Sequence, residues 1–166
     1  MNQPIQIAPV HKSIRVTAPI ERAFQVFTAG IDRWWPRNHK VSAGPLAQVR
    51  LEPRVGGRWI EVDEGGAETV VATVTAWDPP RHLALRWQIN ARWQADPTMA
   101  SEVDVTFTVD DEGGTRVDVV HAKFETMGPV DGASMRRDVD GGWVGLLGLY
   151  AALLQGEGEG EGAGPA

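Results

Sequence analysis

The chain is 166 residues long, a length typical of a single domain. Its 22 acidic side chains outnumber its 16 Lys and Arg residues, and the formal net charge is -6. This balance argues against a nucleic-acid-binding protein, which needs a basic surface to displace counterions from phosphate. Apolar residues make up 42% of the chain, enough for a packed core, and the absence of cysteine excludes disulfides, thiolate metal sites and thiol nucleophiles.

The sequence shows no segment that would direct the chain to a membrane. Residues 1–9 lack the basic region followed by an apolar run that marks a signal peptide. The longest nearly uncharged stretch, residues 141–155, is shorter than the roughly 20 apolar residues that span a bilayer. We therefore expect a cytoplasmic protein with no membrane span.

The first elements are predicted to be a strand and two short helices. Residues 10–17 alternate between apolar and polar side chains, as in a half-buried strand. Pro19 suits the first turn of a helix, and residues 20–27 then carry apolar side chains at helical spacing. A second short helix or turn over residues 31–35 ends at Pro36.

Six further strands are predicted between residues 46 and 123. Each is a short run in which apolar and polar side chains alternate, the pattern of a sheet with one dry face. Turn signals separate the runs, namely glycine or proline pairs at residues 56–57, 65–66, 79–80 and 113–114. A longer loop over residues 90–100 carries Trp93.

The last predicted element is a long helix from about Asp138 to Leu154. Its apolar residues fall on one wide face and are Trp143, Leu146, Leu147, Tyr150, Leu153 and Leu154. Gly145 and Gly148 each lower intrinsic helix stability by about 1 kcal/mol relative to alanine, so packing must hold this helix. We expect the glycines to allow a close approach by another element. Residues 156–166, GEGEGEGAGPA, are predicted to be a disordered tail.

This order of elements predicts one α+β domain over residues 10–155. One long C-terminal helix must cover the dry face of a curved antiparallel sheet of about seven strands. A strongly bent sheet that wraps around a single helix leaves a cavity between the two. The cavity is therefore where we look for a site.

Several short motifs follow one another in a characteristic order. They are Thr17-Ala18-Pro19, Trp34-Trp35-Pro36, Gly56-Gly57-Arg58-Trp59, the stretch from Trp77 to Leu83, Gly114 to Val117 followed by His121, and Gly142-Trp143. Over roughly residues 10–154 the chain resembles the START-like helix-grip domains of the SRPBCC superfamily, and within it the family named after the activator of heat-shock-protein-ninety ATPase. The resemblance implies a helix-grip fold with a hydrophobic pocket. Because relatives include lipid carriers, hormone receptors, polyketide cyclases and co-chaperone domains, it implies no single activity.

Tryptophans are the leading candidates for contact with a ligand. Trp87 lies on the apolar face of its strand, Trp143 lies on the apolar face of the last helix, and Trp59 shares a face with Glu61. Together with Trp35, or its neighbour Trp34, these residues would line a cavity that stacks a flat or apolar molecule. The alternative is ordinary core packing of large aromatic side chains.

His121 and Glu61 are the polar candidates. His121 lies on the apolar face of its strand, where it would bind a ligand oxygen or act as a general base. The alternative is a core histidine bonded to a carbonyl. If Glu61 is buried it needs a partner, and otherwise it is an exposed strand acid. The candidates for that partner are Arg58, Arg86 and His121.

The sequence carries no motif for a metal, a cofactor or a nucleophile. Its four histidines are far apart without ligand spacing, and there is no G-x-S-x-G. No helix is predicted after the glycine pairs at 56–57 and 65–66, so these pairs are turns rather than phosphate-binding loops. We expect no bound metal and no cofactor.

The sequence therefore predicts a monomer or homodimer that binds a small apolar or amphipathic molecule between sheet and last helix. One alternative is a protein-interaction module that uses its outer surface. Another is a cyclase or hydrolase that uses His121 and Glu61. A tryptophan-lined cavity favours the first, an exposed apolar patch the second, and polar groups that converge inside the cavity the third.

Overall fold

The computed structural model describes residues 6–41 and 44–163, except for the side chains of residues 157–163. Within these residues the elements follow the predicted order, with one short 3-10 helix added before the last helix. The elements are β1 (Val10–Val16), α1 (Ile20–Thr28), α2 (Ile31–Trp34), β2 (Leu46–Leu51), β3 (Arg58–Asp63), β4 (Glu68–Asp78), β5 (His82–Trp87), β6 (Ser101–Val109), β7 (Thr115–Ala122), η1 (Phe124–Met127) and α3 (Pro129–Ala163).

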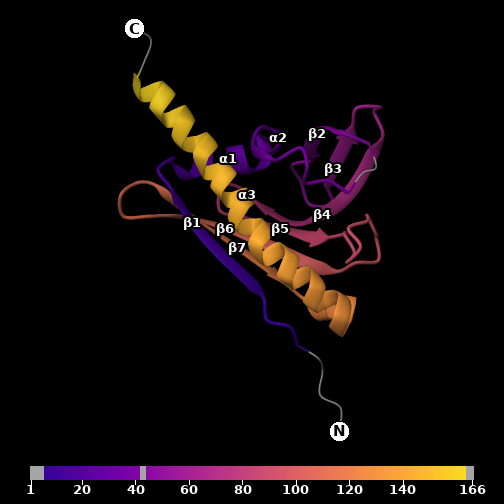
Figure 1. Cartoon of the computed structure of the whole chain (residues 1–166). Coiled ribbons are helices and arrows are strands. Elements are labelled where there is room, and N and C mark those ends of the chain that lie inside the picture. The colour runs from indigo at the N-terminus through magenta and orange to yellow at the C-terminus, as the bar shows by residue number, and fades with distance from the viewer. Residues whose placement is uncertain (1–5, 42–43, 164–166) are drawn as a thin grey trace.

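The seven strands form one antiparallel sheet in the order β1-β7-β6-β5-β4-β3-β2, and α3 lies across one of its faces (Figure 1). Register shifts interrupt the pairing of β2 with β3, of β3 with β4 and of β4 with β5. Such bulges bend a strand and increase its local twist, so this half of the sheet curls. The predicted α+β helix-grip fold is confirmed.

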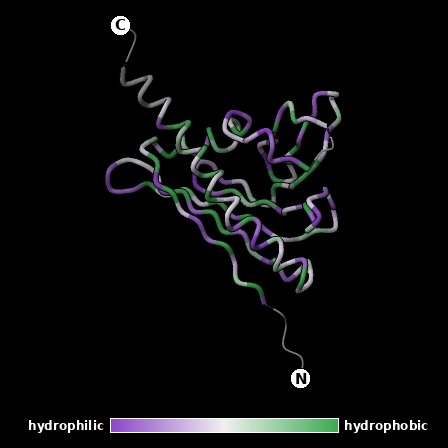
Figure 2. The backbone as a smooth tube through the Cα atoms, viewed as in Figure 1, coloured by the Kyte–Doolittle hydropathy of each residue, from purple (hydrophilic) through white to green (hydrophobic). Residues whose placement is uncertain are grey.

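The face of the sheet that meets α3 is dry because apolar side chains alternate along β5, β6 and β7. Their burial alternates residue by residue, and the hydropathy of the chain alternates with it (Figure 2). The buried side chains of α3 are Met135, Val139, Trp143, Leu146, Leu147, Tyr150 and Leu154. Tyr150 also donates its hydroxyl to the Ala23 carbonyl at 2.6 Å, which ties α3 to α1.

Helix α3 is longer than the sequence predicted at both ends. It begins at Pro129 rather than near Asp138, because a proline fits the first helical turn and Gly128 before it has a positive φ of 91°. It continues to Ala163, through most of the segment that we predicted to be disordered. Once a helix has formed, each added residue gains a backbone hydrogen bond without a new nucleation step.

The close approach expected of the α3 glycines occurs at Gly132, not at the predicted positions. A Cβ at Gly132 would lie 2.2 Å from the Phe124 carbonyl oxygen, a distance that no side chain tolerates. A Cβ at Gly145 or Gly148 would meet no atom within 4 Å. Gly132 therefore allows the first turns of α3 to lie against η1.

We expect the deletion of residues 156–166 to leave the melting temperature unchanged. The C-terminal end of α3 extends beyond the sheet (Figure 1), and a Gly/Glu repeat has no apolar side chain to bury. A thermal melt followed by circular dichroism measures this. As a control, a deletion that begins at Leu154, which is 4% exposed, should lower the melting temperature. A drop of several degrees on the shorter deletion would mean that the tail packs against the domain.

Candidate functional site

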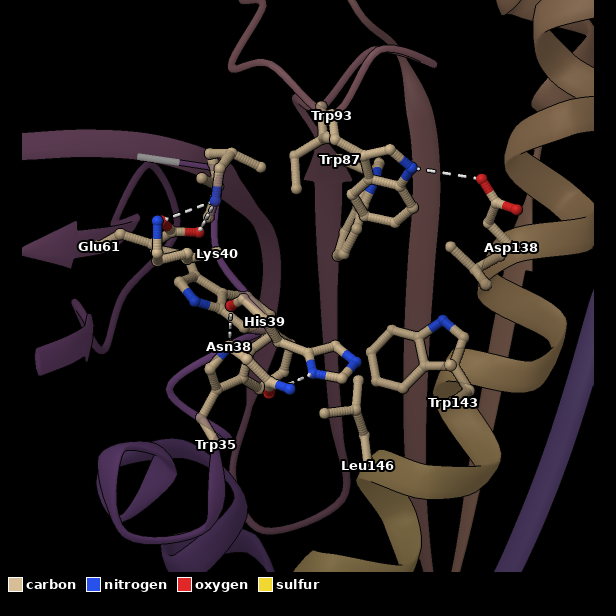
Figure 3. Close-up of a pocket in the computed structure, with 16 residues that line it drawn as sticks. Trp35, Asn38, His39, Lys40, Glu61, Trp87, Trp93, Asp138, Trp143 and Leu146 are labelled. Atoms are coloured by element: carbon tan, nitrogen blue, oxygen red, sulfur yellow. Dashed lines mark hydrogen bonds between the residues drawn. The ribbon is translucent and has the colours of Figure 1, made fainter. Parts of the chain in front are cut away.

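A cavity of about 340 Å³ lies between α3 and the part of the sheet formed by β3, β4 and β5 (Figure 3). Its walls come from residues 35–41 after α2, from these strands, from the loop after β5 and from one face of α3. Its volume lies within the range of about 300–1,000 Å³ that is usual for small-molecule sites. The lining is mostly apolar, with polar side chains at a few positions.

Indole rings make up much of the cavity wall. Ring centroids lie 4.8 Å apart for Trp35 and Trp59, 6.3 Å for Trp59 and Trp87, and 6.3 Å for Trp87 and Trp143. These four rings are therefore in contact from the segment after α2, across the sheet, to α3. Alternation on β3 and β5 turns Trp59 and Trp87 toward this side of the sheet.

Trp34 lies in the core, which resolves the choice between it and Trp35. It is 4% exposed and its indole N–H donates to the Val26 carbonyl at 3.0 Å. Trp35 instead donates to the His39 carbonyl at 2.8 Å and lines the cavity.

Trp87 has a buried indole nitrogen without a hydrogen-bond partner in the described part of the chain. Leaving a buried N–H unpaired costs about 1–3 kcal/mol, and unpaired buried groups in folded proteins are uncommon. Trp87 lines the cavity and also has a buried indole N–H that the described residues leave unused.

Glu61 is the buried acid of the cavity, with 3% of its surface exposed. Both carboxylate oxygens accept the Val41 backbone N–H, at 3.0 and 3.1 Å. Of the partners that the sequence suggested, Arg58 pairs with Glu52 at 2.9 Å. Glu61 thereby links β3 to the segment that forms one side of the cavity.

Residues 36–39 form a tight turn that holds His39 over the cavity. The His39 backbone N–H donates to the Pro36 carbonyl at 3.1 Å, and its own carbonyl accepts the Trp35 indole N–H. The imidazole projects toward the indole of Trp143 (Figure 3). Its Nδ1 lies 3.3 Å from Oδ1 of Asn38.

Trp93 joins the loop after β5 to α3 at the cavity. Its indole N–H donates to Oδ2 of Asp138 at 3.2 Å (Figure 3). Its backbone φ is 58°, a left-handed conformation that is unfavourable for a residue with a large side chain. Trp93 is on the predicted loop, and from there it lines the cavity.

His121 does not line the cavity and lies behind the wall, in the core. It is fully buried, and its ring centroid lies 5.0 Å from that of Trp87. Trp143 donates its indole N–H to Nδ1 of His121 at 3.3 Å, so Nε2 carries the proton and faces the Ser101 hydroxyl at 3.2 Å. Burial lowers the pKa of His121 to about 3.

Five of the six predicted site residues therefore come together at the cavity, namely Trp35, Trp59, Glu61, Trp87 and Trp143. His121 lies in the core, as in the alternative reading, but its ring nitrogens meet Trp143 and Ser101 rather than a carbonyl. The polar lining residues after α2, and Asp138 on α3, were not among the residues predicted from the sequence. Alternation gave no signal for them, because a loop has no periodicity and Asp138 lay at the expected start of the helix.

The described residues contain no group of three or more metal-ligating side chains. Nor do they include a helix that is both long and apolar enough to cross a membrane.

The comparison with protein families identifies the chain. The model of the family described as "Activator of Hsp90 ATPase homolog 1-like protein" matches residues 17–154. The chain belongs to this family. Its membership confirms the resemblance that the motifs of the sequence indicated. No curated protein sequence matches the chain.

Two of the solved structures that match the chain have sequences more than a third identical to it. An anthrahydroquino-gamma-pyrone synthase, Txn09, complexed with SUM, is 37% identical, with a TM-score of 0.62 over 89% of this chain and 97% of that one. A self-sacrificing resistance protein, CalC from Micromonospora echinospora, is 34% identical, with a TM-score of 0.67 over 90% and 95%. Protein MLL2253 from Mesorhizobium loti is 20% identical, with a TM-score of 0.64 over 89% and 97%, and shares the fold.

Proposed function

We propose that the protein binds a small, flat aromatic molecule of amphipathic character in the cavity between the sheet and α3. The observation that carries the proposal is the indole-lined cavity itself. Contacting indoles offer flat faces and edges on which an aromatic ring stacks. Burial of apolar ligand surface against them supplies the binding free energy, and the polar side chains on the walls orient the ligand.

The relatives support a ligand of this kind. The 37% identical protein is named for a product with fused rings and was solved in a complex. The 34% identical protein is a resistance protein. The name of the first also favours a second candidate, an enzyme that acts on the bound molecule. Native mass spectrometry of the freshly purified protein would identify a co-purified molecule, and incubation with that molecule would show whether it is converted.

We expect Gly142→Leu to block binding while it stabilises the helix. Gly142 lines the cavity, one turn from Asp138 and one turn from Leu146, so its Cβ position faces the same side. A Cβ there would meet no atom within 4 Å, so the leucine extends into the cavity. Replacing a helical glycine should raise stability by about 1 kcal/mol. Quenching of tryptophan fluorescence by anthraquinone or by the methyl ether of umbelliferone measures affinity, and urea denaturation measures stability.

Gly145→Leu is the matched control. Gly145 is exposed on the same helix and also has free space at its Cβ position. The control should gain similar stability and keep its affinity for both probes. Equal affinity of Gly142→Leu and wild type, or failure of the wild type to bind a varied panel of flat aromatic probes, would contradict the proposal.

The protein-interaction alternative requires an exposed apolar patch. Among the described residues, three of the six large exposed apolar side chains lie on α3 and the other three lie on separate segments of the chain. The six are Val55, Trp93, Val109, Val130, Val144 and Leu149. A protein partner that binds outside the cavity stays a prediction. Failure of the wild type to bind any of the aromatic probes would favour it.

A further inference from the structure

We infer that the ligand carries a hydroxyl group and that His39 determines this specificity by accepting its hydrogen bond. The inference rests on the proposed function and names the ligand class more closely, as a phenolic or enolic aromatic molecule. His39 was not among the residues that the sequence indicated. The inference depends on how its backbone is held, on the hydrogen bond of its Nδ1 and on the partners of the other polar side chains of the cavity.

The backbone of His39 is fixed from two sides. The turn over residues 36–39 closes through the His39 N–H and the Pro36 carbonyl, at 3.1 Å. The Trp35 indole N–H holds the His39 carbonyl at 2.8 Å, and the ring of Trp35 packs in turn against Trp59 at 4.8 Å. The backbone from which the imidazole extends is therefore held in place by the aromatic wall, through Trp35.

The side chain of Asn38 determines which nitrogen of His39 is available. Nδ1 of His39 lies 3.3 Å from Oδ1 of Asn38, and an amide oxygen only accepts hydrogen bonds. Nδ1 must therefore donate, and in the neutral imidazole this leaves the lone pair on Nε2. The ring points across the cavity toward Trp143 rather than away from it (Figure 3). The polar group offered to a ligand on this side is thus a hydrogen-bond acceptor.

The other ionisable side chains of the cavity already have protein partners. The carboxylate of Glu61 accepts the Val41 N–H, and Asp138 accepts the Trp93 indole N–H. Lys40 also interacts within the protein, and an ammonium group can only donate. Aromatic faces on the opposite wall would hold the ring system of the ligand, while its hydroxyl group faces Nε2 of His39.

Umbelliferone and its methyl ether test this inference, because the ether keeps the ring system and removes the hydroxyl donor. In the wild type we expect umbelliferone to bind about three- to tenfold more tightly, the range of one ordinary hydrogen bond. His39→Leu should abolish this preference and leave the affinity for the methyl ether unchanged. His39→Gln, whose amide oxygen can accept, should restore part of the preference.

The control variant is His11→Leu, since His11 is an exposed histidine on β1, at the far edge of the sheet from β3. It should keep the full preference. Two probes that bind the wild type equally would overturn the role of His39 while the proposed function stands. A preference that survives in His39→Leu and is lost in Asp138→Ala would place the acceptor on α3 and overturn the assignment to His39. Failure of both probes to bind would overturn the inference together with the proposed function.

Discussion

Trp143→Ala should destabilise the fold by about 3–5 kcal/mol, a large share of the roughly 5–15 kcal/mol that holds a domain together. Trp143 is 1% exposed, packs against Trp87 and donates its indole N–H to the buried His121. Its removal enlarges a cavity that is already present and leaves Nδ1 of His121 without its donor. The denaturant midpoint of unfolding measures the effect.

Val144→Ala is the matched control for this prediction, because Val144 is the next residue of α3 and is 57% exposed. A surface substitution of this kind changes stability by no more than about 0.5 kcal/mol. If both variants unfold at the wild-type midpoint, Trp143 does not hold α3 on the sheet.

Acidification should destabilise the protein through His121. Above pH 6.5 the imidazole is neutral in both the folded and the unfolded chain, so stability does not depend on it. Below pH 6.5 the unfolded state binds a proton that the folded state, with a pKa of about 3, does not. Stability then falls as the pH falls, by up to about 1.4 kcal/mol per pH unit, until the folded state also binds the proton near pH 3.

His121→Asn isolates this contribution, because the amide does not titrate. The variant starts from a lower stability at neutral pH, but its stability should fall less steeply on acidification than that of the wild type. Denaturation curves at a series of pH values give both slopes, and equal slopes for His121→Asn and wild type would contradict the prediction.

Alternation predicted that Trp87 faces inward and that Trp59 and Glu61 share a face, and all three side chains are buried and line the cavity. It does not report the distance of a residue from the cavity. His121 faces inward as expected, yet it lies one layer behind the cavity wall. The curl of the sheet, which its bulges produce, decides which inward residues line free space, and no sequence pattern indicated those bulges.

The positions of residues in loops also could not be predicted from the sequence. His39 and Trp93 come from segments without periodicity, and each is held by a local backbone hydrogen bond together with an indole hydrogen bond, from Trp35 to His39 and from Trp93 to Asp138. The first turns of α3 were missed because glycines at 128, 132, 141 and 142 resemble a loop by composition. Tertiary packing against η1 and the sheet overrides that low propensity.

The close contact between Gly132 and η1 affects the width of the cavity from a distance, because it determines how near α3 lies to the rest of the fold. Gly132 lies about two turns before Asp138, on the same continuous helix. Any side chain at 132 would have to displace the Phe124 carbonyl or lift the helix, and a lifted helix carries one whole wall of the cavity with it. Substitution of Gly132 by alanine or serine is therefore expected to widen the cavity, although residue 132 is not part of its lining.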